Sequence, residues 1–172
     1  MKGLDTEPYK GVRDFYPEDW GRLSAVFNRI REVLSKYGYE EYQASPLERA
    51  EMYESKGNEE IIREQTYTFE DRGGRRVTLR PEMTPTLARM VAHKRREMPF
   101  PLRWFSIGNR FRYERPQRGR LREFFQTDVD FVGLPAGEDR RRFPFFLRDR
   151  GMRGMPVREF RHSALAPRTR RP

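Results

Sequence analysis

Hydrophobic residues recur at intervals of three and four positions between Pro17 and Tyr37, which is the period of an amphipathic helix. Pro17 with the acidic pair Glu18 and Asp19 is a typical helix start, and Gly38 is a typical stop. The pattern predicts a helix of about five turns over residues 17–37. Its apolar stripe consists of Leu23, Val26, Phe27, Ile30, Val33, Leu34 and Tyr37.

Shorter elements follow this helix. Residues 39–44 are typical of a strand that ends at Ser45-Pro46, and residues 48–55 of a short helix. Residues 66–69 and 77–79 flank the turn sequence Asp71 to Gly74, which predicts a hairpin. The charged stretch 57–63 has no clear period.

A second helix is predicted from Thr84 to about Arg96. Thr84 is a typical N-cap with Pro85 at the first helical position, and Pro99 and Pro101 lie beyond its end. Leu87, Met90 and Val91 are expected to point inward.

Alternation of polar and apolar residues marks two further strands, at 110–114 and 124–131. Their connection, residues 115–122, contains four arginines and exceeds the two to five residues usual for a hairpin loop. One face of the second strand is expected to pack on a core and the other to carry site residues. These faces are Phe125, Thr127, Val129 and Phe131, and Phe124, Gln126, Asp128 and Asp130.

The side chains of this strand pair suit a nucleotide and a small zwitterion, because they combine an arginine, a neighbouring carboxylate and an aromatic ring. The alternative is an exposed hairpin with a solvated charged edge. Glu82 and Thr84, at the junction of a strand and a helix, can present oxygens to an ammonium group. The alternative there is that Thr84 only caps the helix and Glu82 is solvated.

Composition narrows the classes of protein. The 172 residues suffice for about one domain, and the absence of cysteine excludes disulfides and zinc–thiolate sites. His93 and His162 lack metal-ligand spacing, so no metal site is predicted. No apolar run approaches the ~20 residues that span a bilayer, and no signal peptide is recognisable, so a soluble cytoplasmic protein is expected.

The net charge of +10 favours an anionic partner and is concentrated near the C-terminus. Residues 137–172 contain eleven arginines and four acidic residues, with many Pro and Gly, and are predicted to be disordered. Three accounts fit this tail: a nucleic-acid-binding arm, a solvated terminus, or translation in a shifted reading frame. We favour the shifted frame.

Four motifs resemble the N-terminal part of histidyl-tRNA synthetase, a class II aminoacyl-tRNA synthetase, over about Lys10 to Pro135. The most specific pair is Leu79–Pro85 followed by motif 2, Phe111–Gln117 through Phe124–Gln126. The others are Lys10–Asp14 and the motif 1 pattern from Tyr37 to Pro46. The resemblance implies an α+β fold, in which residues 1–136 form a partial, antiparallel class II sheet with flanking helices.

The resemblance also implies residue roles. Arg112 would be the catalytic residue, holding the α-phosphate of ATP and the histidine carboxylate. Glu114 would contact the adenine amino group, Phe124 would stack on adenine, and Arg120 would meet ATP phosphates or the tRNA acceptor end. The histidine-binding residues would be Glu82, Met83, Thr84, Gln126 and Asp130, the last standing where many family members carry Glu.

The implied activity is ATP- and Mg²⁺-dependent activation of histidine and its transfer to tRNA-His, in a homodimer formed through motif 1. Because motif 3 and the anticodon-binding domain are missing, the chain is expected to be inactive alone. Two alternatives stay open: a non-catalytic regulatory subunit of ATP phosphoribosyltransferase, and a basic tRNA- or RNA-binding module.

Overall fold

A computed structural model of the chain describes residues 6–54, 64–115 and 120–133. The chain divides into two compact units, and each is described by itself. Unit 1 comprises Met1–Ala25, Ala44–Thr86 and Gly108–Gln126, and unit 2 comprises Val26–Gln43, Leu87–Ile107 and Thr127–Pro172. The predicted tail and the ambiguous stretch 57–63 lie outside the described residues.

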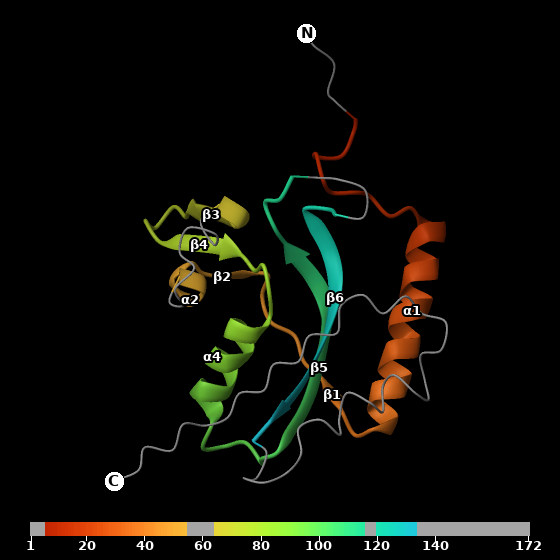
Figure 1. The fold of residues 1–172 in the computed structure, drawn as a ribbon, viewed down its shortest axis with the longest axis vertical. Helices are drawn as coiled ribbons and strands as arrows, with labels where there is room; N and C mark the ends of the chain where they lie inside the picture. The colour runs from red at the N-terminus through yellow and green to blue at the C-terminus, as the bar shows by residue number, and fades with distance from the viewer. Residues whose placement is uncertain (1–5, 55–63, 116–119, 134–172) are drawn as a thin grey trace. The chain divides into compact units, whose positions relative to one another are not determined.

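The two long helices that the sequence predicts are both present (Figure 1). Helix α1 covers Pro17–Lys36, and Gly38 after it has a φ of 74°, the left-handed conformation that glycine adopts without strain. Helix α4 covers Thr84–Lys94 and starts at the predicted residue. The Gly38 stop and the Thr84 start are where the sequence predicts them, because capping residues act locally, whereas α4 ends at Lys94, before the predicted Arg96.

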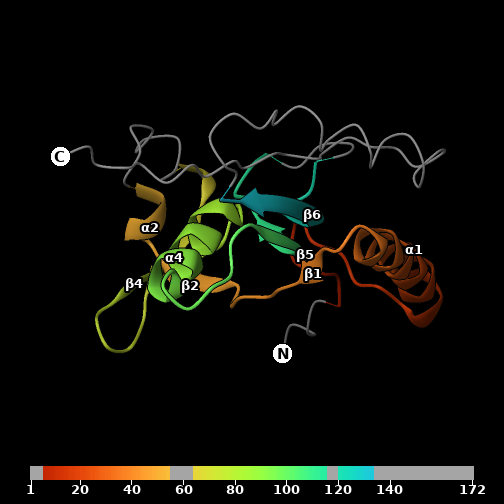
Figure 2. The same ribbon diagram turned by 90° about the horizontal axis from the view of Figure 1, so that it is seen from below.

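The first sheet has the strand order β1-β5-β6, and both ribbon views show the three strands side by side (Figures 1 and 2). Strand β5 spans Leu102–Phe111 and β6 spans Glu123–Val132, so β5 both begins and ends earlier than the strand predicted at 110–114. Strand β1, Glu40–Glu41, is shorter than predicted and pairs in parallel with Trp104 and Phe105. The sheet is therefore mixed rather than purely antiparallel.

The second sheet, β2-β4-β3, belongs to unit 1. Strands β3, Tyr67–Glu70, and β4, Arg76–Leu79, form the predicted hairpin. The short helix predicted at 48–55 is wrong in its first half: β2 covers Leu47–Arg49, and α2 covers only Glu51–Glu54. The reason is non-local, because β2 gains an antiparallel ladder with residues 77–79 of β4.

The two units differ in what they bury. Unit 2 has an apolar core made of Phe27, Ile30, Val33, Leu34, Leu87, Val91, Leu102, Phe105, Ile107, Val129 and Val132. The buried residues of unit 1 are mostly polar: Thr78, Arg80, Thr86, Arg110 and Gln126, with Ala50, Tyr53 and Met83. Buried polar groups cost free energy unless they are hydrogen-bonded, so unit 1 depends on specific contacts.

Strand β6 departs from expectation in one respect. Gln126, Asp128 and Asp130, which were expected on the face opposite the core, are 5%, 6% and 2% exposed. Phe125 and Phe131 on the alternate face are only partly buried. The alternation holds, but the polar face is the more deeply buried one.

The α+β class with flanking helices is thus confirmed. Among the described residues, no helix combines the length and the apolar character needed to cross a bilayer.

Candidate active site

Arg112 and Phe124 come together in unit 1, on the residues that follow β5 and those that begin β6. The Cζ atom of Arg112 lies 5.1 Å from the centroid of the Phe124 ring, a cation–π distance. The Nε of Arg112 donates to the Pro81 carbonyl at 3.2 Å. Both contacts hold the guanidinium in place without using a carboxylate, so its charge is available to an anion.

Glu114 and Arg120 face each other across the base of the loop. The Arg120 Nη1 lies 3.4 Å from the Glu114 Oε2, and the side chains are 65% and 22% exposed respectively. An ion pair this exposed contributes little to stability. A ligand could therefore displace it at small cost.

Tyr53 of α2 supports the Glu82–Thr84 junction through hydrogen bonds of its hydroxyl. The Tyr53 hydroxyl donates to the Glu82 carbonyl at 3.2 Å and lies 3.1 Å from the Thr86 hydroxyl. Tyr53 is 4% exposed, and burial raises the pKa of its hydroxyl, which favours the neutral donor form.

Arg80 supports the same junction. Its Nε donates to the Asn109 carbonyl at 3.1 Å, and its Nη1 to the Ala44 carbonyl at 2.8 Å. The same Nη1 lies 3.7 Å from the Met83 sulfur. Met83 is only 1% exposed, so this predicted histidine-binding residue lies beneath the junction rather than on its surface.

Gln126 and Asp130 are both on β6, but they fall in different units. In unit 2 the Tyr42 hydroxyl donates to the Asp130 Oδ2 at 3.1 Å. Burial, and then the Asp130 charge, raise the pKa of Tyr42 well above its ordinary value. Tyr42 therefore remains a neutral donor that orients the Asp130 carboxylate.

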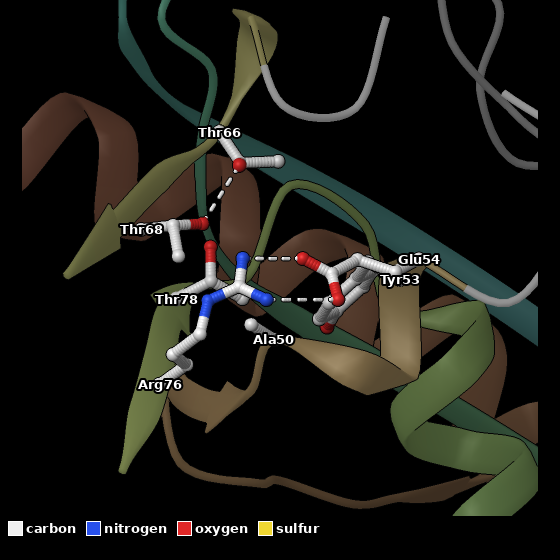
Figure 3. Close-up of a pocket in the computed structure, with 7 residues that line it drawn as sticks. All are labelled: Ala50, Tyr53, Glu54, Thr66, Thr68, Arg76 and Thr78. Carbon is white, nitrogen blue, oxygen red and sulfur yellow. Dashed lines mark hydrogen bonds and ion pairs between the residues drawn. The ribbon is translucent and has the colours of Figure 1, made fainter. Parts of the chain in front are cut away.

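A pocket of about 220 Å³ lies in unit 1 beside the small sheet (Figure 3). Thr66, Thr68 and Thr78 line it together with the ion pair of Arg76 and Glu54, whose atoms approach to 2.5 Å. No predicted site residue lines it. Its wall includes Tyr53, which also supports the Glu82 junction.

Sequence reasoning did not single out Arg80, Tyr53, Tyr42 or Arg122 as support for the site. Arg80 and Arg122 lie within the motifs that were considered. Arg80 donates to the Asn109 and Ala44 carbonyls and Arg122 to the Glu114 carbonyl, and backbone carbonyls leave no trace in residue type. Tyr42 and Tyr53 looked like ordinary apolar positions. A tyrosine with an unusual degree of burial needs a partner for its hydroxyl, but burial is not visible in the sequence.

Comparisons with known proteins identify the family of the chain. A family described as histidyl-tRNA synthetase matches residues 11–139. The histidine–tRNA ligase of Leptospira biflexa is 53% identical over 133 residues, which cover 77% of this chain and 30% of that protein. The chain therefore spans about a third of the length of this curated relative.

Two solved structures are similar as well. The histidyl-tRNA synthetase of Nostoc sp. PCC 7120 aligns with a TM-score of 0.62 and 25% identity, covering 73% of this chain and 28% of that one. A Bacillus halodurans protein, described as an ATP phosphoribosyltransferase regulatory subunit/histidyl-tRNA synthetase, aligns with a TM-score of 0.61 and 26% identity, covering 74% and 32%. With most of its described residues inside the family match, the chain belongs to the histidyl-tRNA synthetase family.

Proposed function

We propose that this chain carries residues that bind ATP and residues that bind histidine in an adenylation site. In the complete reaction, histidine and ATP give histidyl-adenylate, and the histidyl group passes to tRNA-His. The observation that carries the proposal is the placement of Arg112 between Phe124 and the Pro81 carbonyl, with the Glu114–Arg120 pair nearby.

Adenylation requires the protein mainly to align histidine with ATP and to supply positive charge near the phosphates. The histidine carboxylate is ionised near neutral pH, so it attacks the α-phosphorus without a general base, and pyrophosphate leaves. Catalysis then consists of holding the two reactants in line and stabilising the charge on the phosphorus oxygens. A fixed guanidinium supplies bidentate donors of the right geometry for both phosphate and carboxylate.

Each site residue has a role in this proposal. Arg112 contacts the α-phosphate and the histidine carboxylate, while Glu114 accepts from the adenine amino group. Phe124, which has Arg112 on one face, offers its ring to adenine. Arg120 meets the outer ATP phosphates or the tRNA acceptor end. By resemblance to the family, Glu82, Met83, Thr84 and Gln126 of unit 1 are assigned to histidine binding, and Asp130 of unit 2 has the same role by resemblance alone.

Mg²⁺ is expected to arrive with ATP. In residues 6–54, 64–115 and 120–133, no three Asp, Glu or His side chains form a group that could hold a metal ion. Mg²⁺ in such sites takes most of its ligands from substrate phosphates and water. The ion would neutralise phosphate charge, and the protein's own contribution is the arginines.

Since the chain spans about a third of its curated relative, we propose that it binds ATP but does not complete aminoacylation alone. The homodimer through the motif 1 segment, Tyr37–Pro46, is part of the same proposal. Size-exclusion chromatography with light scattering distinguishes a monomer of 20.8 kDa from a dimer.

The test of this function is the affinity of the chain for MgATP, measured by isothermal titration calorimetry. Arg112→Ala is expected to weaken binding on the order of 100-fold, because a preorganised phosphate donor is lost. The matched control is Arg75→Ala, an arginine whose side chain is 79% exposed. An unchanged affinity in Arg112→Ala would contradict the role of Arg112.

A regulatory subunit remains the second candidate, because the Bacillus halodurans relative carries both descriptions. Histidine binding without Arg112-dependent ATP binding would favour it. The RNA-binding module predicts instead a salt-dependent affinity for tRNA with no ATP binding.

A further inference from the structure

Arg122 is the point at which the N-terminal segment meets the strands of the candidate site. All of its partners lie in unit 1, although they come from residues 9–11 and from residues 112–114. Arg122 itself is partly buried, and none of the roles proposed above uses it.

The backbone of Arg122 links both segments. Its amide donates to the Gly11 carbonyl at 2.7 Å, and its own carbonyl accepts from the Arg112 amide at 2.9 Å. The Glu123 amide also donates to the Gly11 carbonyl, at 3.3 Å. The backbone of Arg122 is thus hydrogen-bonded to Gly11 through its amide and to Arg112 through its carbonyl.

The guanidinium of Arg122 makes a second set of contacts. Its Nε donates to the Glu114 carbonyl at 3.1 Å, and its Nη1 donates to the Tyr9 hydroxyl at 3.3 Å. The Cζ atom lies 4.2 Å from the centroid of the Tyr113 ring and 5.8 Å from that of Tyr9. The guanidinium therefore contacts both tyrosine side chains, while its Nε reaches the Glu114 backbone.

Gly11 lies so close to the Arg122 side chain that a Cβ does not fit there. Its φ is +90°, and a Cβ at this position would lie 2.7 Å from the Cγ and 2.8 Å from the Cδ of Arg122. Any larger residue would therefore push Arg122 away from the Glu114 carbonyl. The N-terminal segment and the arginine are packed against each other without spare room.

We propose that Arg122 is a positioning residue for nucleotide binding. Held by Tyr9 and Gly11, it fixes the backbone at Arg112 and Glu114. The Glu114 carboxylate is then positioned to accept a hydrogen bond from the adenine amino group. The inference rests on the proposed ATP binding and extends it, because it makes residues 9–11 a functional part of the site. Lysine cannot replace Arg122, since an ammonium lacks the planar fork and stacks less well between rings.

The experiment compares the affinities of the chain for MgATP and MgGTP by calorimetry. Arg122→Lys is expected to weaken MgATP binding about tenfold and MgGTP binding much less, because the lost hydrogen bond acts on the residue that recognises the adenine amino group. Gly11→Ala is expected to lower the same preference. Arg75→Lys, on an exposed arginine, is the control and keeps the parental preference.

The preference for ATP over GTP separates positioning from a general structural effect. Equal weakening of both nucleotides would contradict the proposal, as would an unchanged preference in both variants. If circular dichroism shows that Arg122→Lys is unfolded, Gly11→Ala decides by the same criterion. A parent chain that binds no MgATP would overturn the proposed function itself, and the role of Arg122 with it. A parent that binds MgATP through Arg112, with variants that keep its preference, would overturn only the role of Arg122.

Discussion

The two ends of strand β4 place similar charged residues in opposite surroundings. At the first end, Asp71 and Arg75 form an exposed ion pair at 2.8 Å, with 25% and 79% of their side chains accessible. At the second end, Arg80 is 4% exposed and donates to two backbone carbonyls. An arginine at the first end only supports a turn, whereas an arginine at the second end organises the Glu82 junction.

The difference shows that the burial of an arginine, rather than its residue type, decides whether it only stabilises an exposed turn or supports the candidate site. Around Asp71 the charges lie in water, where each pair contributes between about 0 and 1 kcal/mol. Around Arg80 each polar atom has been taken out of water, so losing a partner leaves a desolvated group behind. Mutations at the two ends should therefore differ more than their chemistry suggests.

The largest expected contrast is between two arginine-to-methionine changes. Arg80→Met removes the donor of the Ala44 carbonyl and one of the two donors of the Asn109 carbonyl, which also accepts from Arg110 Nη1, and we expect it to lower the free energy of unfolding by about 3 kcal/mol. Arg75→Met should change it by less than about 0.5 kcal/mol. Urea denaturation followed by circular dichroism measures both, and equal effects would contradict the comparison.

A smaller effect is expected at Tyr53. Tyr53→Phe keeps the ring but removes the hydroxyl from the Glu82 carbonyl and Thr86, which should cost about 1 kcal/mol of unfolding free energy. Tyr16→Phe is the matched control, because Tyr16 is 73% exposed. If both variants unfold at the same urea concentration, Tyr53 does not support the junction as described.

Alkaline pH should act on the buried end through the same hydroxyl. Burial raises the pKa of Tyr53 above its unfolded value of about 10, so its stabilising contribution is complete below about pH 10 and is lost as pH rises through the folded pKa. The difference in unfolding free energy between the parent and Tyr53→Phe should shrink between about pH 10 and pH 12, where Tyr53 of the unfolded chain ionises while the buried hydroxyl stays neutral. A difference that stays constant over this range would show that the hydroxyl is not protected from ionisation.

Acid should act on the exposed end, with the smallest effect. The Arg75 amide, then the Gly73 amide and the Arg75 guanidinium, hold the pKa of Asp71 below its ordinary value. Its contribution is therefore present above an unfolded pKa of about 3.9 and is lost as pH falls through the folded pKa. Hydrogen exchange should show weaker protection of the Arg75 amide at about pH 3 than at about pH 5 in the parent, and no such change in Asp71→Asn. Loss of protection in both proteins would assign the effect to another group.

Local signals made much of the fold predictable. The Gly73-Gly74 turn, the Thr84-Pro85 helix start and the Gly38 stop each act within a few residues, and all three elements are where the sequence places them. Strand β2 was missed because its ladder with β4 joins positions that are distant in sequence. The helical pattern of residues 48–55 could not reveal that competing partner.

The residues of the candidate site could be predicted from the sequence better than the contacts that hold them in place. Motif spacing selected Arg112, Glu114 and Phe124, and the structure brings Arg112 to Phe124. The burial of the polar face of β6 was not foreseen, since alternation shows which residues share a face but not which face is covered. Contacts such as Arg122 to Gly11 run through backbone atoms, and every residue type carries those.

The pairing of β1 with β5 also has a consequence for how the chain acquires its structure during synthesis. Strands β2, β3 and β4 all lie between Leu47 and Leu79, whereas β1 can pair only after Trp104 of β5 has been synthesised. At about 5–20 residues per second, the ribosome adds the partner of β1 roughly one to five seconds after the small sheet is complete. The nascent chain can thus form the β2-β4-β3 sheet first, while β1, whose two glutamates are exposed even in the finished fold, stays soluble until β5 emerges.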